Sequence, residues 1–488
     1  MGGLRGEYSM IKITKRAVCL VLISLIMFSH VNIETLWAND RQLPVHLIIE
    51  RVTDDFIFSG QVLFYYREHG RSAPVLKPLC NFPIIIRYTY LPYSQQFYEL
   101  VEINTITDEY GQFFYRTSTP NITPHSYINA QIRIVANDGI SSFVVGDGVL
   151  TGNFFDTVTP SRALRHDTPW IEQRLPALSS FDFGDIVAEP SGAFNIVRTI
   201  QQGFEFMKST PNVSPPSKTP IVWTDSVIFD TSGMYNFYAG FVYISANPNA
   251  MEAFNKSLVL HEYGHVVMFD MLENNLRDNS SSGLGFVWDS WNKSRFDLDP
   301  RLAFNEGWAT FFGQSVLNYD RYIRGNLSHA ATLFYSIENP LDTNAGGFEF
   351  APVDGTTIGS ALFNAAILWD ITDGINTNEV NPFIENATWE DRVQRDFSEL
   401  FNIVAYTLNN ADPYMWNSPL NFLLGFAPPI PWRGTHLVPD ATMEDFFRNY
   451  LNHNISPNSR EALYFWKVFN YNGMQFDYIP PQCINFVC

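Results

Sequence analysis

Cysteine is scarce in this chain, with four residues among 488. Cys19 lies within an N-terminal apolar segment, and no pair of cysteines has the spacing of a zinc finger. The three cysteines that remain make an odd number, so at least one thiol stays free or pairs between chains. Two pairings stay open, either Cys483 with Cys488 or Cys80 with Cys483.

Basic residues are also in short supply. Lysine and arginine number 31 against 50 aspartates and glutamates, which gives a formal net charge of −19. This imbalance argues against nucleic-acid binding and against attraction to an anionic membrane surface. Internal repeats and low-complexity tracts are absent, while 46% hydrophobic and 15% aromatic residues predict a globular protein with two domains or one large one.

Long apolar runs are missing outside the N-terminus. There, basic residues precede an apolar segment over 17–28, and Ala38 offers a small residue at a plausible cleavage point. This pattern predicts a secretory signal peptide over 1–38, because the run is too short to span a membrane comfortably. We therefore expect a secreted, extracellular or cell-envelope protein that is not an integral membrane protein once processed.

The next part of the chain is rich in strand-forming residues. Over residues 41–150, short β-branched and aromatic runs alternate with turns, and about seven strands in this length predict an all-β sandwich. The segment 107–115 resembles a turn of transthyretin-like or carboxypeptidase-regulatory modules. Prolines mark 151–190 as a connector, and 191–488 has the composition of an α+β domain with a mainly helical C-terminal part.

One segment concentrates the chemistry, His261-Glu262-Tyr263-Gly264-His265. Histidines four residues apart share one face of a helix, so both imidazoles can reach one metal ion. Glu262 projects to the edge of that face, where it can accept a proton from an attacking water. Apolar residues on both sides of the segment predict a buried helix. The alternative is a core helix with two hydrogen-bonded histidines.

A catalytic zinc site needs a third protein ligand. Glu306 is the candidate, because it is a single carboxylate within the apolar and aromatic segment 304–312. An isolated buried charge is too costly unless it is paired, protonated or bound to a metal. Ala309 and Gly313 share a face with Glu306 and allow another helix to approach closely.

HEYGH followed by NEGWA resembles the gluzincins, the zinc metallopeptidases that include thermolysin and fungalysin. The resemblance covers residues 190 to 375. It implies a zincin-like domain, zinc on His261, His265 and Glu306, and Glu262 as general base. Residues 235–244 resemble the upper edge strand that pairs with an extended substrate, where Asn236 would bind the substrate backbone. An ordinary tyrosine-rich strand is the alternative.

The chain departs from this family at two places. The aspartate that orients a zinc histidine in thermolysin-like enzymes is replaced by Thr310, as in the aminopeptidase branch. The histidine that stabilises the oxyanion falls on Thr356 or Ile358, depending on the alignment. Four residues remain as replacement candidates: His329, Tyr335, Tyr406 and His436.

These patterns predict a secreted zinc endopeptidase that acts on peptide or protein substrates. Residues 249–253 lie too close to His261 to form the amine-binding loop of aminopeptidases, so they are interpreted as the start of the zinc helix. The rival prediction is an inactive secreted or envelope binding protein that keeps the zincin fold. Four aspartates can hold calcium, although solvated carboxylates are the default reading: Asp297, Asp299, Asp370 and Asp373.

Overall fold

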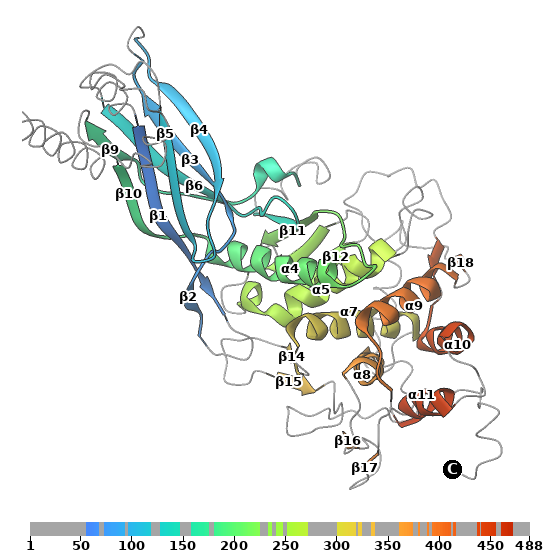
Figure 1. Cartoon of the computed structure of the whole chain (residues 1–488). Coiled ribbons are helices and arrows are strands. Elements are labelled where there is room, and N and C mark those ends of the chain that lie inside the picture. Colours follow the sequence, from blue (N-terminus) through green and yellow to red (C-terminus); the bar gives the residue numbers. More distant parts are fainter. Residues whose placement is uncertain are drawn as a thin grey trace, which may run out of the picture.

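The computed structural model describes twenty segments of the chain and shows a strand-rich part followed by a mainly helical part (Figure 1). The described residues are 55–67, 73–92, 96–118, 127–146, 158–174, 180–224, 233–236, 241–246, 251–271, 300–318, 321–324, 333–336, 361–373, 379–380, 388–389, 393–410, 413–415, 437–439, 441–454 and 460–471. The predicted succession of strands and then helices is confirmed. The predicted signal peptide and two of the cysteines, Cys483 and Cys488, lie outside these segments.

Two sheets face each other in the strand-rich part (Figure 1). The first sheet is built around β1 (Asp55–Tyr66), which pairs with β10 (Ser180–Val187) in parallel and with β2 (Val75–Pro78) and β5 (Gln112–Ser118) antiparallel. The second sheet has the order β4 (Glu99–Ile106), β3 (Pro83–Tyr90), β6 (Tyr127–Val135) and β8 (Arg165–Asp167), with β9 (Ile171–Arg174) also on β6.

Alternation of side chains explains how these sheets pack. Along β3, Ile84, Ile86 and Tyr88 are buried while the residues between them are half-buried, as expected when one face of a strand meets the core. Phe58 of the first sheet stacks on Tyr88 of the second, with ring centroids 5.4 Å apart. The two sheets therefore share one hydrophobic core.

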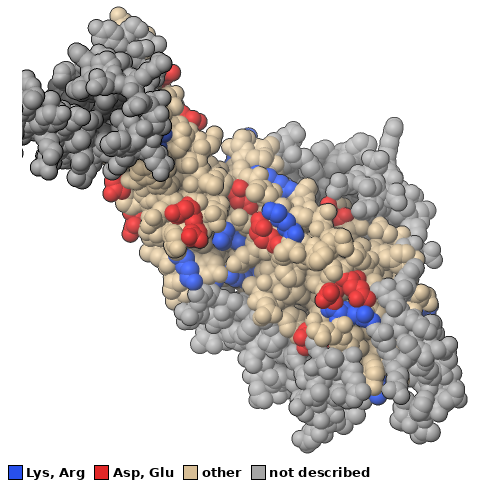
Figure 2. Space-filling view, viewed as in Figure 1, with Lys and Arg blue, Asp and Glu red and all other residues tan. Residues whose placement is uncertain are grey.

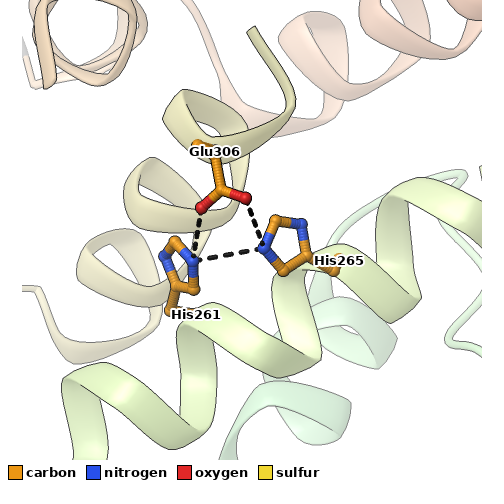
Figure 3. A group of neighbouring side chains, drawn as sticks. All are labelled: His261, His265 and Glu306. Atoms are coloured by element: carbon orange, nitrogen blue, oxygen red, sulfur yellow. Dashed lines mark hydrogen bonds and ion pairs between the residues drawn. The ribbon is translucent and has the colours of Figure 1, made fainter. Parts of the chain in front are cut away.

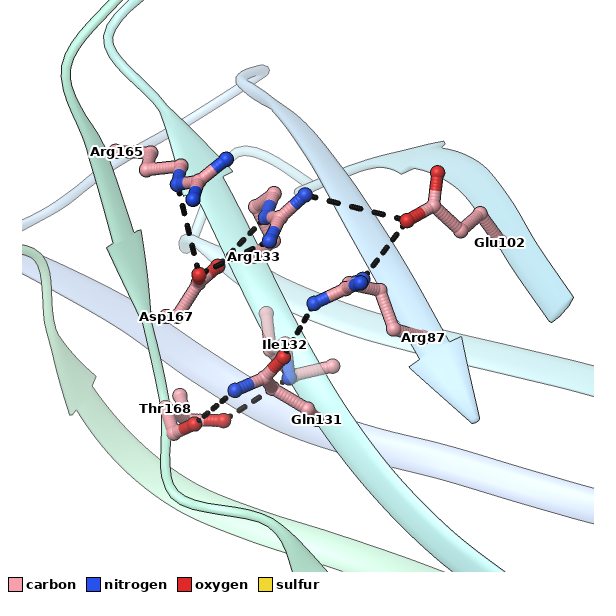
Figure 4. Close-up of polar contacts among 8 residues, drawn as sticks. All are labelled: Arg87, Glu102, Gln131, Ile132, Arg133, Arg165, Asp167 and Thr168. Atoms are coloured by element: carbon pink, nitrogen blue, oxygen red, sulfur yellow. Dashed lines mark hydrogen bonds and ion pairs between the residues drawn. The ribbon is translucent and has the colours of Figure 1, made fainter. Parts of the chain in front are cut away.

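The outward face of the second sheet carries a cluster of paired charges, the arginine cluster (Figure 4). The Arg133 guanidinium donates two hydrogen bonds to the Asp167 carboxylate, at 2.7 and 3.0 Å, and Arg87 donates one to Glu102 at 2.8 Å. Arg165 also lies 3.6 Å from Asp167. Each carboxylate of this cluster meets a guanidinium, and Figure 2 shows acidic and basic side chains interspersed over one face of the molecule.

The helical part also contains a third sheet. Its strands have the order β12 (Gly233–Asn236), β13 (Phe241–Ser245), β11 (Thr219–Thr224) and β7 (Ser142–Val145). The last three are parallel, and β12 is an antiparallel edge strand. Three small two-stranded sheets lie further along: β14 (Arg321–Arg324) with β15 (Leu333–Ser336), β16 (Glu379–Val380) with β17 (Thr388–Trp389), and β18 (Pro413–Met415) with β19 (Leu437–Pro439).

The helices that surround this sheet and form the C-terminal part are α4 (Ser191–Ser209), α5 (Lys256–Met271), α7 (Pro300–Leu317), α8 (Ala361–Thr372), α9 (Phe397–Asn410), α10 (Met443–Asn454) and α11 (Arg460–Tyr471). Short 3-10 turns occur at η3 (Pro160–Arg162) and η4 (Glu252–Phe254). No helix in the described part of the chain is both long enough and apolar enough to cross a bilayer.

The two parts of the molecule are joined through packing. Phe82 of the strand-rich part meets Phe194 of α4 edge to face, with ring centroids 6.0 Å apart. Lys256, the first residue of α5, is buried, and its ammonium donates to the Tyr66 hydroxyl at the end of β1 and lies 4.3 Å from the centre of the Tyr66 ring. The helix that carries the two histidines is therefore anchored on the strand-rich part.

The segment 151–190 differs from its predicted role as a connector. It supplies β8 and β9 to the second sheet and β10 to the first. Conversely, β7 falls within the predicted sandwich module at 41–150 but pairs with β11 in the third sheet. The pairing partners of these strands lie far away along the chain, so local composition does not reveal them.

Two smaller expectations were also wrong. Residues 235–244 do not form one strand, because the structure ends β12 at Asn236 and begins its antiparallel partner β13 at Phe241. Residues 251–253 do not begin the helix that carries the two histidines, and residues 249 and 250 lie outside the described residues. Ala253 belongs to the 3-10 turn η4, and α5 starts afterwards, where the Asn255 side chain accepts the backbone N–H of Leu258 at 3.3 Å as a cap.

Candidate metal centre

Helix α5 is buried around almost its whole circumference. Its sequence is apolar before and after the two histidines, and His261, Glu262 and His265 are buried, with 8%, 5% and 6% of their surface exposed. A helix that is hydrophobic on all sides belongs in the core of a large domain. The prediction of a buried helix is therefore confirmed, and the histidines are held on a rigid support.

Small residues bring α5 and α7 into backbone contact. A Cβ atom at Gly264 would lie 2.9 Å from the Ala309 Cα, and one at Gly313 would lie 3.3 Å from the His261 backbone nitrogen. Only glycine permits the first approach without a shift of the helices. The predicted role of Ala309 and Gly313 is confirmed, whereas the matching role of Gly264, inside the HEYGH segment, was not recognised from the sequence.

This contact places three ligand atoms around one point (Figure 3). The His261 Nε2 lies 3.1 Å from one Glu306 oxygen and 3.2 Å from the His265 Nε2, which lies 3.6 Å from the other Glu306 oxygen. A tetrahedral zinc ion with bonds of about 2.1 Å separates its ligand atoms by about 3.4 Å. The distances of this group thus fit a single metal ion, and the donor atoms all lie within 4.8 Å of one another.

The outer nitrogen of each histidine is also held. The His261 Nδ1 lies 3.1 Å from the Thr310 hydroxyl, and the His265 Nδ1 donates to the Asn305 amide oxygen at 2.7 Å. Such hydrogen bonds fix the ring orientation and keep Nε2 as the metal-binding atom. The structure thus places Thr310 behind His261, where the resemblance implies an orienting side chain. Asn305 was missed, although its position directly before Glu306 was the available signal.

The charges of the group depend on one another. Burial lowers the pKa of His265, but the Glu306 carboxylate outweighs burial and, together with Glu262 and Asn305, raises this pKa to about 9. Burial raises the pKa of Glu306, and the two imidazoles reverse this and hold it well below its usual range. These opposite shifts of the two pKa values show that a positive charge beside the carboxylate is favoured in this group.

No protein-family model matches this chain, and a search of curated proteins finds no match. The interpretation of the site therefore depends on its residues and geometry. Among the described residues, His261, His265 and Glu306 form the one group of three or more potential ligands that could hold a metal ion. The group brings together all three predicted ligands.

The other predicted site residues do not belong to this group of three. Asn236 ends the edge strand β12, which lies against α5. Tyr335 lies on β15, and Tyr406 lies on α9 with 40% of its surface exposed. The remaining oxyanion candidates and the aligned threonine and isoleucine lie outside the described residues: His329, His436, Thr356 and Ile358.

The calcium prediction concerns four aspartates in two places. Asp370 is buried in α8 and Asp373 is exposed just beyond its end. Asp297 and Asp299 lie outside the described residues. Calcium binding therefore stays a prediction.

Cys80 is half-buried, and its thiol donates to the Pro78 carbonyl at 3.4 Å.

Proposed function

We propose that this protein is a zinc-dependent metallopeptidase of the gluzincin type that cleaves internal peptide bonds. The observation that carries this proposal is the convergence of His261, His265 and Glu306 from two packed helices, at separations that fit one ion. Glu262 lies beside this group, since its charge contributes to the raised pKa of His265. Two histidines, one glutamate and an adjacent carboxylate are the components that a hydrolytic zinc site uses.

The donor set favours zinc over harder cations. Calcium and magnesium prefer shells made of oxygen ligands, whereas two imidazole nitrogens and one carboxylate suit zinc. Three protein ligands leave a coordination position for water or substrate, as in catalytic rather than structural zinc sites. Zinc bound here would act as a Lewis acid that polarises the scissile carbonyl and makes a water molecule more acidic.

The protein side chains would then handle the protons. Glu262 accepts a proton from the attacking water while the water oxygen forms a bond to the carbonyl carbon. Glu262 then gives that proton to the leaving amine. Breakage of the C–N bond yields one new carboxyl group and one new amine. Thr310 and Asn305 keep the imidazoles oriented throughout, so the metal ligands need no rearrangement during the reaction.

The position of the third sheet next to α5 is consistent with an extended peptide as the substrate. Strand β12 is at the edge of its sheet among the described strands and lies against α5. An edge strand can pair with an extended chain through backbone hydrogen bonds, which is independent of the substrate side chains. We infer that Asn236, at the end of this strand, binds the substrate backbone. The proposal also includes secretion and a transthyretin-like sandwich for the strand-rich part.

The deciding experiment removes the proposed base and keeps the metal ligands. Glu262→Gln should bind zinc at one ion per chain and lose at least about a thousandfold in hydrolysis of unfolded casein, because the proton acceptor is gone. Glu205→Gln, a similar change at an exposed position of α4, is the matched control and should keep full activity. Proteolysis that survives in Glu262→Gln would remove this residue from the mechanism.

The same preparation distinguishes the rival function. Loss of casein cleavage on chelation and its return on addition of zinc would support the enzyme. One bound zinc per chain with no hydrolysis of casein or of a mixed peptide library would instead support a secreted or envelope binding protein that keeps the zinc site without turnover.

A further inference from the structure

The outward face of the first sheet of the strand-rich part contains a hollow, which we call the sheet hollow. Strand register places two rows of side chains across three strands there. One row is Phe114, Ser59 and Asp182, from β5, β1 and β10 in that order. The second row is formed in the same way by Gln112, Gln61 and Asp185. Both rows line a hollow of about 690 Å³.

Two glycines make the floor between these rows. The pairing of β1 with β10 shifts its register between Ser59 and Gln61, so Gly60 and Gly184 fall at an irregularity. Gly184 adopts a φ of +59°, which favours glycine, and a Cβ there would meet nothing within 4 Å. The floor therefore borders open space at Gly184, which lets a ligand approach the backbone closely there, whereas a Cβ at Gly60 would meet the Phe113 ring at 2.9 Å.

The walls combine an aromatic ring with many hydrogen-bonding groups. Phe114 is 66% exposed and Ile106, at the rim, is 64% exposed, which is unusual for large apolar side chains on strands. Around them are amides from Gln61, Gln112 and Asn81, which offer both donors and acceptors. Of the three aspartates in the lining, Asp108 and Asp182 each accept backbone N–H groups of their own turns, and Asp185 offers a further carboxylate.

The lining discriminates between classes of ligand. No lysine or arginine lines the hollow, so a phosphate, a sulfated glycan or another anion would meet three carboxylates and no cationic side chain. The aspartates of the hollow do not form a group close enough to hold a metal ion, among the described residues. A sugar hydroxyl both donates and accepts hydrogen bonds, and a pyranose ring presents an apolar C–H face to an aromatic ring. Both properties match this lining.

We infer that the sheet hollow binds a neutral polysaccharide, with a pyranose unit packed on Phe114 and its hydroxyl groups bonded to Asp185 and the neighbouring amides. The volume of about 690 Å³ is of the size found for small-molecule binding pockets. This inference goes beyond the proposed peptidase activity, since the hollow lies on the strand-rich part and its residues are separate from the metal ligands. Such binding would attach the protein to glycan-rich surfaces.

The test is binding of the full-length protein, with a chelator present so that binding is measured apart from hydrolysis. The probes are soluble starch, mannan, xylan and mixed-linkage β-glucan, with alginate as an anionic polysaccharide, in affinity electrophoresis and calorimetry. At least one neutral probe should bind, and alginate should not. Phe114→Ala and Asp185→Asn should each weaken binding about tenfold, while Phe114→Trp should retain it.

Phe97→Ala provides the control, because Phe97 is 79% exposed and does not line the hollow. This variant should bind like the unmodified protein. The inference is overturned if no neutral probe binds, if Phe114→Ala binds as well as the unmodified protein, or if a hexalysine peptide binds in a Phe114-dependent way while the polysaccharides do not. The last result would assign the hollow to a basic peptide. None of these outcomes depends on zinc or on peptidase activity.

Discussion

In the strand-rich part, Arg133 and Arg87 neutralise Asp167 and Glu102 on the outer face of a sheet (Figure 4). In the helical part, the Glu306 carboxylate is shared between two imidazoles that lie between packed helices (Figure 3). The first arrangement satisfies its own charges, because each carboxylate has a guanidinium partner. The second directs two imidazole nitrogens and a carboxylate at one point, an arrangement that could hold a metal ion.

The contrast shows which feature separates a structural cluster from a binding site. Both clusters hold ionisable groups at distances near 3 Å, so proximity alone does not distinguish them. The difference lies in the outer contacts, since Thr310 and Asn305 hold the outward nitrogens while both inward nitrogens face the same carboxylate. A cluster whose members are held from behind is prepared for a ligand.

The largest effect is expected from removal of the ligand carboxylate. Glu306→Gln keeps the side-chain size but loses the anionic oxygen, so zinc affinity should fall by more than about a hundredfold. This loss exceeds the one usually seen when a residue that hydrogen-bonds a metal ligand is replaced. Titration against a chromophoric zinc chelator measures this change. Glu102→Gln, in the arginine cluster, is the control and should leave zinc affinity unchanged. Equal losses in both variants would erase the distinction between the clusters.

The groups behind the histidines should matter next. Asn305→Ala and Thr310→Val should each lower zinc affinity about 10- to 100-fold, because the imidazoles lose their fixed orientation. Asn409→Ala is the control, since Asn409 donates to the Met271 carbonyl at the far end of α5, at 3.0 Å, without contacting either histidine. Unchanged zinc affinity in both test variants would show that the outer contacts are only structural.

The close approach of the two helices can be tested with one methyl group. Gly264→Ala should lower the free energy of unfolding by about 1–3 kcal/mol and also weaken zinc binding, because the new Cβ overlaps the backbone of Ala309. Gly313→Ala meets its neighbours at 3.3 Å and gains about 1 kcal/mol in helix propensity, so its net effect should be small. Urea denaturation compares the two. A larger loss for Gly313→Ala would contradict the helix contact described here.

The arginine cluster should contribute modest stability and nothing to metal binding. The hydrogen bonds from Arg133 hold the pKa of Asp167 below its usual range, although partial burial alone would raise this pKa. The stabilisation is therefore present above the ordinary pKa of about 4 and is lost as pH falls through the lower folded-state value. Arg133→Gln should cost about 1 kcal/mol near neutral pH, with zinc affinity unchanged.

Thermal unfolding at several pH values measures this last effect. The difference in Tm between the unmodified protein and Arg133→Gln should narrow as pH is lowered from about 6 to about 3, as Asp167 becomes protonated. A difference in Tm that stays constant over this range would assign the effect of Arg133 to packing of its alkyl chain instead.

The three residues of the candidate metal site were accessible from the sequence because their chemistry is local. The spacing of His261 and His265 within one helix fixes their common face, and a lone glutamate in an apolar segment identifies Glu306. Asn305 and Gly264 were less visible, because an amide or a glycine has many ordinary roles and acquires this one only when α5 and α7 are in contact.

The fold was predictable in outline only. Alternation along β3 indicates a half-buried strand, whereas the four buried residues of β7 carry no alternation, as is typical of a strand within a parallel sheet. The parallel pairing of β10 with β1 brings together segments that are far apart in the sequence. Such long-range pairing is decided by the assembled core, so neither its partner nor its register is encoded in the residues of β10 alone.

The path of the chain between its two halves has a practical consequence. The polypeptide leaves the first pair of sheets to add β7 beside β11, returns to them for β8, β9 and β10, and then enters α4. Any single cut in this stretch strips a strand from one half or the other and exposes the apolar surface beneath it. We therefore expect that neither half folds when it is expressed alone, and that engineering of this protein has to treat the pair as one folding unit.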